Sequence, residues 1–440
     1  MIRLVVPIYL VLIVSTVSGE PRSQSCARDN ANSPRQKYRV PRLFNFEVYK
    51  QLFHKTYNSI AEDFARKKIF WARAIRAFLS GVAYKHRKSS DYLAINHMSD
   101  WTKGELRTLH NRVDEDEVYT EQLKAHRPLS KPKKRNKLHE EHLDDTGSSS
   151  GSCFKFPCFS GHSNEISCKN ESDTLFVDHR GCMSKVQRQG FCGSCYVFAV
   201  SSYFEWLHCN KMGELIKFSE QYVLDCGPDT QVGSANNLGG CRGGRVTAVA
   251  RYFERYGAEL AKDYPYKARS GYCPYGNPEE NYEWMGYLKF DQTLSHFIAL
   301  FSDEFVHFIE YSPIVVNLQL RPRFNEYGGG VDEGKSCCDR DKVAACYIHS
   351  VVIVGYGRQD DKEYWLIRNS FSSHWGEKGY YKLSVQAEHC IRGGGGIAFA
   401  TDDGVRHHYN VQINIDRPPL LIGLKHKNRI KKKTKSRLSR

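Results

Sequence analysis

The pattern of apolar and polar positions changes character along the chain. Apolar residues recur at helical spacing within 44–53, from about 60 to 79, directly after Cys195 and within 246–256. From residue 314 onward, short apolar runs of strand length replace this spacing; they cover residues 314–320, 349–356, 364–368 and 380–385. The pattern predicts a helical N-terminal segment followed by a domain with one helical and one β-rich half, which is an α+β fold.

Several stretches lack this periodicity and divide the chain. Residues 1–19 carry a basic residue, an apolar run and small residues before a cleavage point, as in a signal peptide. Later apolar runs are too short to cross a membrane. We therefore expect a signal peptide (1–19), a helical segment (20–112), a basic, Cys-containing linker (113–173), a main domain (174–412) and a basic C-terminal extension (413–440).

The composition is that of a globular protein, with 440 residues, 40% of them hydrophobic and 12% aromatic. The net charge of +15 arises mainly from two segments without acidic residues, 124–137 and 424–440. Such runs are usually solvated. The 424–440 tail is nevertheless a candidate contact for polyanions such as glycosaminoglycans or nucleic acid, and a solvated or removable tail explains it equally well.

The 15 cysteines fit a secretory route, in which disulfides are stable. Asn170 begins a glycosylation sequon in the linker. The three linker cysteines lack a CxxC pair, so disulfides are favoured over metal binding, and we expect no metal and no cofactor.

One cysteine has the surroundings of a nucleophile. Cys195 follows Gln189-Gly190-Phe191-Cys192-Gly193-Ser194, and a helical apolar pattern starts immediately after it. Unpaired N–H groups and the helix dipole at that position favour a thiolate. Gln189 can direct its amide to the same place. The alternative is that Cys195 is half of a disulfide.

This motif resembles the nucleophile motif of the papain family of cysteine proteases. His349 precedes an apolar strand that ends in Gly-Tyr-Gly, and Asn369-Ser370 lies before Trp375-Gly376, which resembles the family's remaining motifs. Phe371 and Ile348 replace the Trp and Asp that are common there. The resemblance implies a two-lobed papain-like fold and a triad of Cys195, His349 and Asn369, with Gln189 and the Cys195 N–H as oxyanion donors.

The N-terminal segment shares part of the family's prodomain pattern. Glu62, Arg66 and Phe70 recur at every fourth residue, which fits either a solvated ion pair or the prodomain signature. Asn96 and Asp100 match a second prodomain motif. The resemblance implies that residues 20–112 form an inhibitory propeptide that runs backwards through the active-site cleft.

The resemblance also implies disulfides and a substrate site. The implied pairs are Cys192–Cys241, Cys226–Cys273 and Cys390 with either Cys337 or Cys338, which leaves the connectivity of Cys182, Cys209 and Cys346 open. Glycines 243 and 244 allow a close approach of substrate backbone. The main side-chain pocket is expected beside Val246, Asn317, Ser350 and Ala400, with Arg245 at its rim. Its polar lining predicts a weak preference for Leu or Phe and tolerance of polar or acidic side chains.

Together these features predict a secreted or lysosomal cysteine endopeptidase, made as a zymogen, with protein or peptide substrates and its own propeptide as intramolecular inhibitor. The alternative is a papain-fold secreted protein with weakened catalysis that acts by binding a polyanion or a protein. Tyr196, Ile348 and Phe371 favour that alternative, and the presence of all four predicted catalytic residues argues against it.

Overall fold

The computed structural model describes residues 44–110, 173–229, 238–275, 288–289, 305, 309–310, 312–338, 346–391 and 425–426. The predicted signal peptide, the sequon at Asn170, Ala400, four cysteines (Cys26, Cys153, Cys158 and Cys168) and nearly all of the basic tail lie outside these residues. Within them, the expected α+β architecture with a helical and a β-rich half is confirmed.

The N-terminal segment (residues 44–110) contains α2 (Phe46–Leu52), α3 (Ile60–Lys85), β1 (Asp91–Leu93) and α4 (Lys103–Arg107). The side chains of Asn45 and Ser59 cap α2 and α3, and Thr102 forms a capping box with Glu105 at α4. The α3 helix is six residues longer than predicted because its buried face continues through Gly81 and Tyr84.

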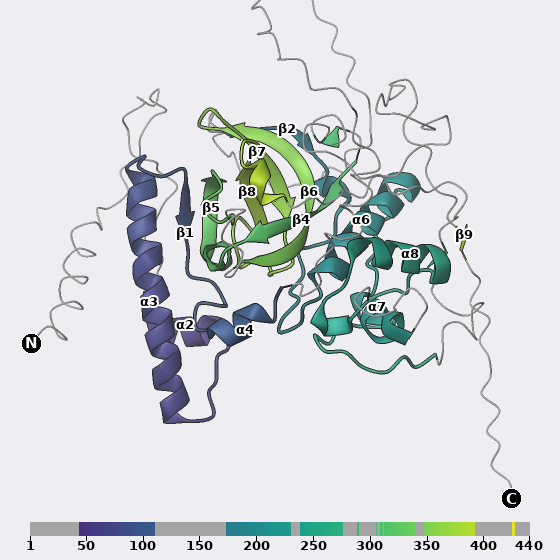
Figure 1. Ribbon diagram of the computed structural model, residues 1–440, viewed down its shortest axis with the longest axis horizontal. Coiled ribbons are helices and arrows are strands. Elements are labelled where there is room, and N and C mark those ends of the chain that lie inside the picture. Colours follow the sequence, from purple (N-terminus) through teal and green to yellow (C-terminus); the bar gives the residue numbers. More distant parts are fainter. Residues whose placement is uncertain are drawn as a thin grey trace, which may run out of the picture.

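The helical half is built around α6 (Cys195–Met212). Its side chains are buried on nearly every face, because α7 (Glu220–Cys226) and α8 (Val246–Tyr256) pack beside it and the sheet packs against it (Figure 1). The predicted bounds of α8 agree with the structure. Ser219 caps α7 by accepting a hydrogen bond from Tyr222 N–H.

The β-rich half is a seven-stranded sheet with the order β1-β5-β8-β7-β6-β2, and β4 also pairs with β6. Its strands are β2 (Asp173–Asp178), β4 (Ile314–Leu320), β5 (Tyr327–Asp332), β6 (Tyr347–Gln359), β7 (Lys362–Arg368) and β8 (Tyr380–Ser384). All pairings are antiparallel except β5 with β8. In the β4–β6 pair, Leu318 lies opposite His349, which fixes that histidine near the start of β6. A separate short pair joins β3 (Leu288–Lys289) to β9 (Lys425–His426).

The N-terminal segment is joined to this sheet through β1. Figure 1 shows α3 beside the sheet, on the side away from α6, and β1 lies between α3 and β5. The β1 strand pairs with β5, and Asp91 forms ion pairs with Arg323 at 2.6 Å and Lys335 at 2.9 Å. The N-terminal segment therefore contributes a strand to the main domain's sheet, which the sequence pattern did not indicate.

Five disulfides join described cysteines: Cys182–Cys209, Cys192–Cys241, Cys226–Cys273, Cys337–Cys390 and Cys338–Cys346. Between the two partners left open for Cys390, the structure selects Cys337. The cysteines whose pairing was open form the remaining two bridges. No helix in the described ranges is both long and apolar enough to cross a membrane.

Candidate active site

The predicted nucleophile lies at the start of the central helix. Cys195 is the first residue of α6, is buried and takes part in no disulfide within the described residues. The preceding residue, Ser194, is the N-cap, and its hydroxyl lies 2.7 Å from the hydroxyl of Tyr266. The first turn of α6 contains no acidic residue, so the positive end of the helix dipole acts on the Cys195 sulfur without an opposing carboxylate in that turn.

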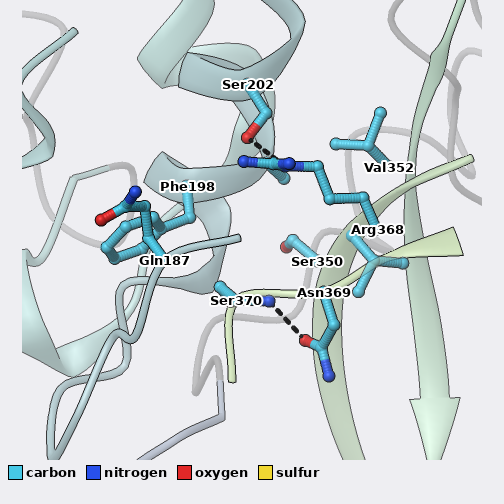
Figure 2. A pocket seen from close by; sticks show the side chains of 10 residues that line it. Gln187, Phe198, Ser202, Ser350, Val352, Arg368, Asn369 and Ser370 are labelled. Carbon is cyan, nitrogen blue, oxygen red and sulfur yellow. Dashed lines mark hydrogen bonds between the residues drawn. The ribbon is translucent and has the colours of Figure 1, made fainter. Parts of the chain in front are cut away.

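The predicted base and its orienting residue are in direct contact. His349 Nε2 lies 2.8 Å from Asn369 Oδ1, and that oxygen also accepts the Ser370 N–H at 2.7 Å (Figure 2). Because an amide oxygen accepts, the proton of the neutral ring lies on Nε2, and Nδ1 keeps its lone pair. Nδ1 has no hydrogen-bond partner among the described residues. The ring is therefore oriented with a basic nitrogen available.

The surroundings of His349 are apolar. The ring centroid of Phe371 lies 4.7 Å away, and that of Phe324 lies 5.6 Å away. Burial lowers the pKa of His349 to about 4, although the hydrogen bond to Asn369 acts in the opposite direction. In this form of the protein the imidazole is therefore neutral near pH 7.

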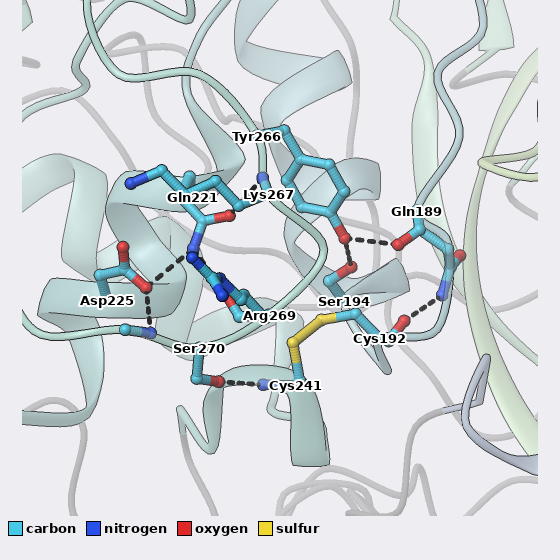
Figure 3. The surroundings of a disulfide bond; sticks show 12 residues. Gln189, Cys192, Ser194, Gln221, Asp225, Cys241, Tyr266, Lys267, Arg269 and Ser270 are labelled. Carbon is cyan, nitrogen blue, oxygen red and sulfur yellow. Dashed lines mark hydrogen bonds between the residues drawn. A yellow bond between two sulfur atoms is a disulfide. The ribbon is translucent and has the colours of Figure 1, made fainter.

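The predicted oxyanion donor is held on three sides. The Gln189 amide oxygen accepts the Ser370 hydroxyl at 2.6 Å, and the Gln189 main-chain oxygen accepts the Tyr266 hydroxyl at 2.7 Å (Figure 3). The amide nitrogen donates to the main-chain oxygens of Cys192 at 2.8 Å and Leu109 at 2.7 Å. The orientation of Gln189 is thus fixed, with its N–H groups directed at carbonyl oxygens.

The second of these carbonyls belongs to the N-terminal segment, which covers the site. A Cβ added at Gly193 would lie 3.1 Å from the main-chain oxygen of His110 and 2.8 Å from that of Cys241. Residues 108–110 therefore pass directly over the loop that leads to Cys195, and the glycine at position 193 allows the close approach of the Cys241 carbonyl from the main domain.

The expected substrate pocket is only partly within the described residues. Gly243 and Gly244 are buried; the Gly243 carbonyl accepts the Gly239 N–H, and Gly244 bridges to Leu238. Val246 begins α8, whereas Ala400 lies outside the described residues. The Ser350 hydroxyl donates to the Asn317 side-chain oxygen at 2.7 Å. These polar groups therefore satisfy one another within the protein.

A small pocket lies between α6 and strands β6 and β7, and Ser350 of the expected substrate pocket is one of its lining residues (Figure 2). Arg368 crosses it and donates hydrogen bonds to Ser202 and Ser184. Its guanidinium thereby ties the two halves of the domain together, and the pocket carries no predicted catalytic group except Asn369.

The sequence analysis did not predict the residues that orient or cover the predicted catalytic groups. Ser370 and Tyr266 orient Gln189, and the Leu109 carbonyl accepts the Gln189 amide N–H. His110 stacks on Tyr347 and lies 5.6 Å from the ring of His349. Ser370 lies inside a recognised motif and could have been found. The other contacts join residues far apart in the chain, for which the sequence pattern carries no signal.

Comparisons with known proteins identify related sequences. The model of a family described as papain family cysteine protease matches residues 173–394. Pro-cathepsin H of Medicago truncatula is 31% identical over 48% of this chain and 56% of its own length. Cathepsin S of Rattus norvegicus is 30% identical over 50% of this chain and 62% of its own length. Probable cysteine protease RD19B of Arabidopsis thaliana is 26% identical over 77% of this chain and 81% of its own length.

Solved structures share the fold over a longer part of the chain. Digestive procathepsin L 3 of the Tenebrio molitor larval midgut aligns with a TM-score of 0.56 at 21% identity, over 81% of this chain and 97% of that chain. Procathepsin L2 from the same source gives a TM-score of 0.56 at 24% identity. The likeness extends over the N-terminal helical region and concerns the fold.

Proposed function

We propose, from the premise that this chain belongs to the papain family of cysteine proteases, that it is the zymogen of a cysteine endopeptidase. In this proposal Cys195 is the nucleophile, His349 the base, Asn369 the orienting residue and Gln189 an oxyanion donor. The N-terminal segment acts as the inhibitory prodomain. The substrates are peptide bonds of proteins or peptides.

The reaction follows from the positions of these groups. Once the N-terminal segment leaves, water reaches His349, its pKa rises, and Nδ1 can accept the proton of Cys195. The thiolate attacks the scissile carbonyl, and the Gln189 amide and the Cys195 N–H stabilise the negative oxygen. His349 then protonates the leaving amine, and water hydrolyses the acyl-enzyme.

One observation carries this proposal: the carbonyl of Leu109 accepts the Gln189 amide N–H at 2.7 Å. A peptide carbonyl thus occupies the donor that the mechanism assigns to the substrate oxyanion. The chain of residues 108–110 also covers the loop before Cys195. The site therefore binds a peptide backbone, and in this form the backbone is its own.

Several features support a secretory location. Five disulfides in the described part of the chain are stable in an oxidising compartment. We propose a secreted or lysosomal enzyme, in agreement with the signal peptide expected from the sequence. Because the Asn317 and Ser350 side chains bind each other, we propose a pocket that tolerates polar side chains without requiring them.

The test is labelling of the cysteine by a mechanism-based thiol electrophile, in the full chain and after removal of the N-terminal segment. We expect fast labelling only after removal, no labelling of Cys195→Ala, and slow labelling of His349→Ala. Hydrolysis of an internally quenched peptide should follow the same order. An unlabelled processed wild type, or equal labelling of Cys195→Ala, would contradict the proposal and favour the binding alternative.

A further inference from the structure

One strand edge of the main domain is covered by the N-terminal segment. In the antiparallel pair of β1 with β5, Asp91 lies opposite Gly330 and Tyr92 opposite Gly329, and Val331 donates its N–H to a carbonyl of the N-terminal segment at 2.8 Å. When that segment leaves, β5 becomes an edge strand whose backbone groups lack these partners. Such an edge is a template for another extended chain. We call this strand the β5 edge.

Beside the β5 edge lies a binding site for one carboxylate. Asp91 is fully buried, and its carboxylate pairs with Arg323 at 2.6 Å and with Lys335 at 2.9 Å. A second buried carboxylate, that of Asp332, lies 3.8 Å from Arg323. With Asp91 in place, two cations balance two carboxylates. Without it, the main domain keeps two cations and one carboxylate, so the cluster has the space and the charge for one further anionic group.

The two cations are held in place by the main domain itself. Asp332 accepts the backbone N–H groups of Lys335 at 2.7 Å and Ser336 at 3.2 Å, which fixes the turn that carries Lys335. The Arg323 guanidinium donates to the Ser336 hydroxyl at 3.4 Å. Because none of these contacts involves the N-terminal segment, the carboxylate site persists after that segment is removed.

Next to the carboxylate site, β5 presents a surface without side chains. Gly328, Gly329 and Gly330 are consecutive. A Cβ added at Gly328 would lie 2.8 Å from the ring of Tyr92, and one added at Gly329 would lie 2.7 Å from the Tyr92 hydroxyl. A side chain at either position would therefore prevent this contact of the ring with the strand backbone. The β5 edge thus accepts an aromatic residue directly after an acidic one.

The other end of the β5 edge has the opposite charge. Glu326 precedes β5 and forms ion pairs with Arg73 and Arg76 of α3, which leave together with the N-terminal segment. A polyanion that lay along the edge would meet this carboxylate. The charge pattern therefore favours a segment with a single acidic residue at the Gly330 end over a uniformly acidic chain.

One polypeptide chain reaches both this edge and the reacting position. In the N-terminal segment, Asp91 lies at the β5 edge, and the carbonyl of Leu109, 18 positions later in the chain, accepts the Gln189 amide N–H. A protein bound in the cleft can therefore place a second part of its chain on the β5 edge, with a linker of about that length.

We infer that the β5 edge of the processed enzyme is a docking site, outside the cleft, for an extended segment of a protein substrate. The segment pairs with β5 as an added strand. Its Asp or Glu binds Arg323 and Lys335, and the Phe, Tyr or Trp that follows lies on the glycines. This inference rests on the proposed function, because the site opens only when the N-terminal segment is removed.

The first experiment measures binding outside the cleft. The processed enzyme carries an irreversible peptidyl electrophile on Cys195, which fills the cleft, and the probe is a fluorescent peptide with the sequence Thr-Asp-Phe-Val-Thr between Gly-Ser flanks. We expect the probe to bind, with about 10-fold weaker affinity when its Asp is replaced by Asn and about 3- to 10-fold weaker affinity when its Phe is replaced by Ala. The full chain, in which the edge is occupied, should bind the probe at least about 10-fold more weakly.

A pair of enzyme variants locates the binding. Lys335→Glu should weaken binding of the probe at least about 10-fold. Lys262→Glu, the same change at an exposed lysine of the helical half, should leave it unchanged. Absence of binding, equal affinity for the Asp and Asn peptides, or unchanged affinity in Lys335→Glu would overturn the inference.

The second experiment asks whether docking assists cleavage. An internally quenched cleavage sequence is joined through about 18 Gly and Ser residues to the same segment, placed before it in one substrate and after it in another. Relative to an Asn-Ala segment, we expect KM to fall about 3- to 10-fold in at least one substrate with kcat within about twofold, because binding away from the reacting bond acts equally on ground and transition states. Lys335→Glu should lose this gain and still hydrolyse the cleavage sequence alone at the parent rate, which shows that the variant is folded.

Failure of the inference and failure of the proposed function give different results. If the cleavage sequence alone is hydrolysed and the segment changes neither affinity nor KM, the docking site is excluded and proteolysis stands. A segment that binds but slows cleavage likewise excludes substrate docking. If the processed protein hydrolyses no peptide and Cys195 is not labelled, the proposed function fails and the inference fails with it.

Discussion

At the scale of single residues, the site depends on groups that never touch a substrate. Ser370 and Tyr266 are the example, because they determine where the Gln189 amide points. The oxygen of that amide is occupied by a serine hydroxyl, so only the nitrogen is left to face a reacting carbonyl. Preorganisation of this kind is what makes an oxyanion donor effective.

The first prediction concerns the donor itself. Gln189→Ala removes one N–H from the developing oxyanion, and we expect kcat to fall by about 10²- to 10³-fold with a smaller change in KM. Steady-state hydrolysis by the processed enzyme measures both constants. Gln187→Ala, two residues earlier in the chain, is the matched control and should keep kcat within a few-fold. A loss that appears only in KM would contradict the assigned role.

The second prediction concerns a positioning residue. Ser370→Ala removes the hydrogen bond to the Gln189 amide oxygen, and a bond of this type contributes about 0.5–1.5 kcal/mol. We expect kcat to fall about 2- to 12-fold, and we expect Ser370→Ala to add little when Gln189→Ala is already present. The exposed Ser373→Ala is the control. Additive losses in the double variant would show that Ser370 acts in some other way.

The residue scale also shows the reach of sequence reasoning. Cys195, His349, Asn369 and Gln189 were predicted because each lies in a short local motif, and the structure brings His349 and Asn369 into contact. Tyr347 escaped notice because it looks like an ordinary β-strand aromatic. It stacks on a ring 237 positions earlier in the sequence, and no local pattern encodes such a pair.

At the scale of elements, the N-terminal segment is held together by the buried face of α3. Phe70 is fully buried against Phe46 and Tyr49, with ring centroids at 5.3 and 4.7 Å. Arg66, one turn earlier, forms ion pairs with Glu62 and Glu105 and so links α3 to α4. Arg66 makes the expected i,i+4 ion pair with Glu62, but its side chain is largely buried and not solvated, because it also pairs with Glu105.

The third prediction follows from this packing. Phe70→Ala should destabilise the N-terminal segment by about 3–5 kcal/mol, because it leaves a cavity against two aromatic rings. Phe64→Ala on the same helix is the control, since Phe64 is 58% exposed. Urea unfolding, monitored by hydrogen exchange of α3, measures the change in the free energy of unfolding. Labelling of Cys195 in the full chain should become faster only for Phe70→Ala. Equal effects of the two variants would show that α3 does not anchor the segment through Phe70.

Element bounds were predictable where a periodic pattern is long and buried. The bounds of α8 and β4 were predicted without error, because apolar residues recur at helical spacing along α8 and form a short run of strand length in β4. The β1 strand was missed because three residues carry no measurable period. What makes Asp91–Leu93 a strand is the open edge of β5, and that edge is set by tertiary structure.

At the scale of the whole molecule, the N-terminal segment and the main domain form one sheet and share a set of buried histidines. His97 and His110 belong to the N-terminal segment, and His349 belongs to the main domain. Burial lowers the pKa of all three, to about 4 for His349 and well below the usual range for the other two. His97 is also affected by Arg188, Lys55 and His374, and His110 by His349, each of which acts in the same direction.

These shifts make docking of the N-terminal segment depend on pH. A histidine whose pKa is lowered in the docked form takes up a proton only after the segment is released. Above about pH 6.5 it is neutral in both forms and does not oppose docking. As the pH falls toward 4, protonation of the released form progressively weakens docking. Asp332, whose pKa is raised by burial and by Asp91, acts in the opposite direction. Three histidines against one such carboxyl group give a net weakening of docking in acid.

The fourth prediction measures this weakening in the full-length Cys195→Ser variant, which cannot process itself. Hydrogen exchange of residues 91–94, whose backbone pairs with the main domain, reports opening of the segment once intrinsic exchange is corrected for. Each histidine contributes up to about tenfold per pH unit, so protection should fall at least about 10-fold between pH 7 and pH 5. His110→Phe removes one titrating group and keeps a flat ring beside Tyr347, so its loss of protection should be smaller, whereas the exposed His86→Phe should behave like the parent. If His110→Phe lost as much protection as the parent, His110 would not be among the groups that couple docking to pH.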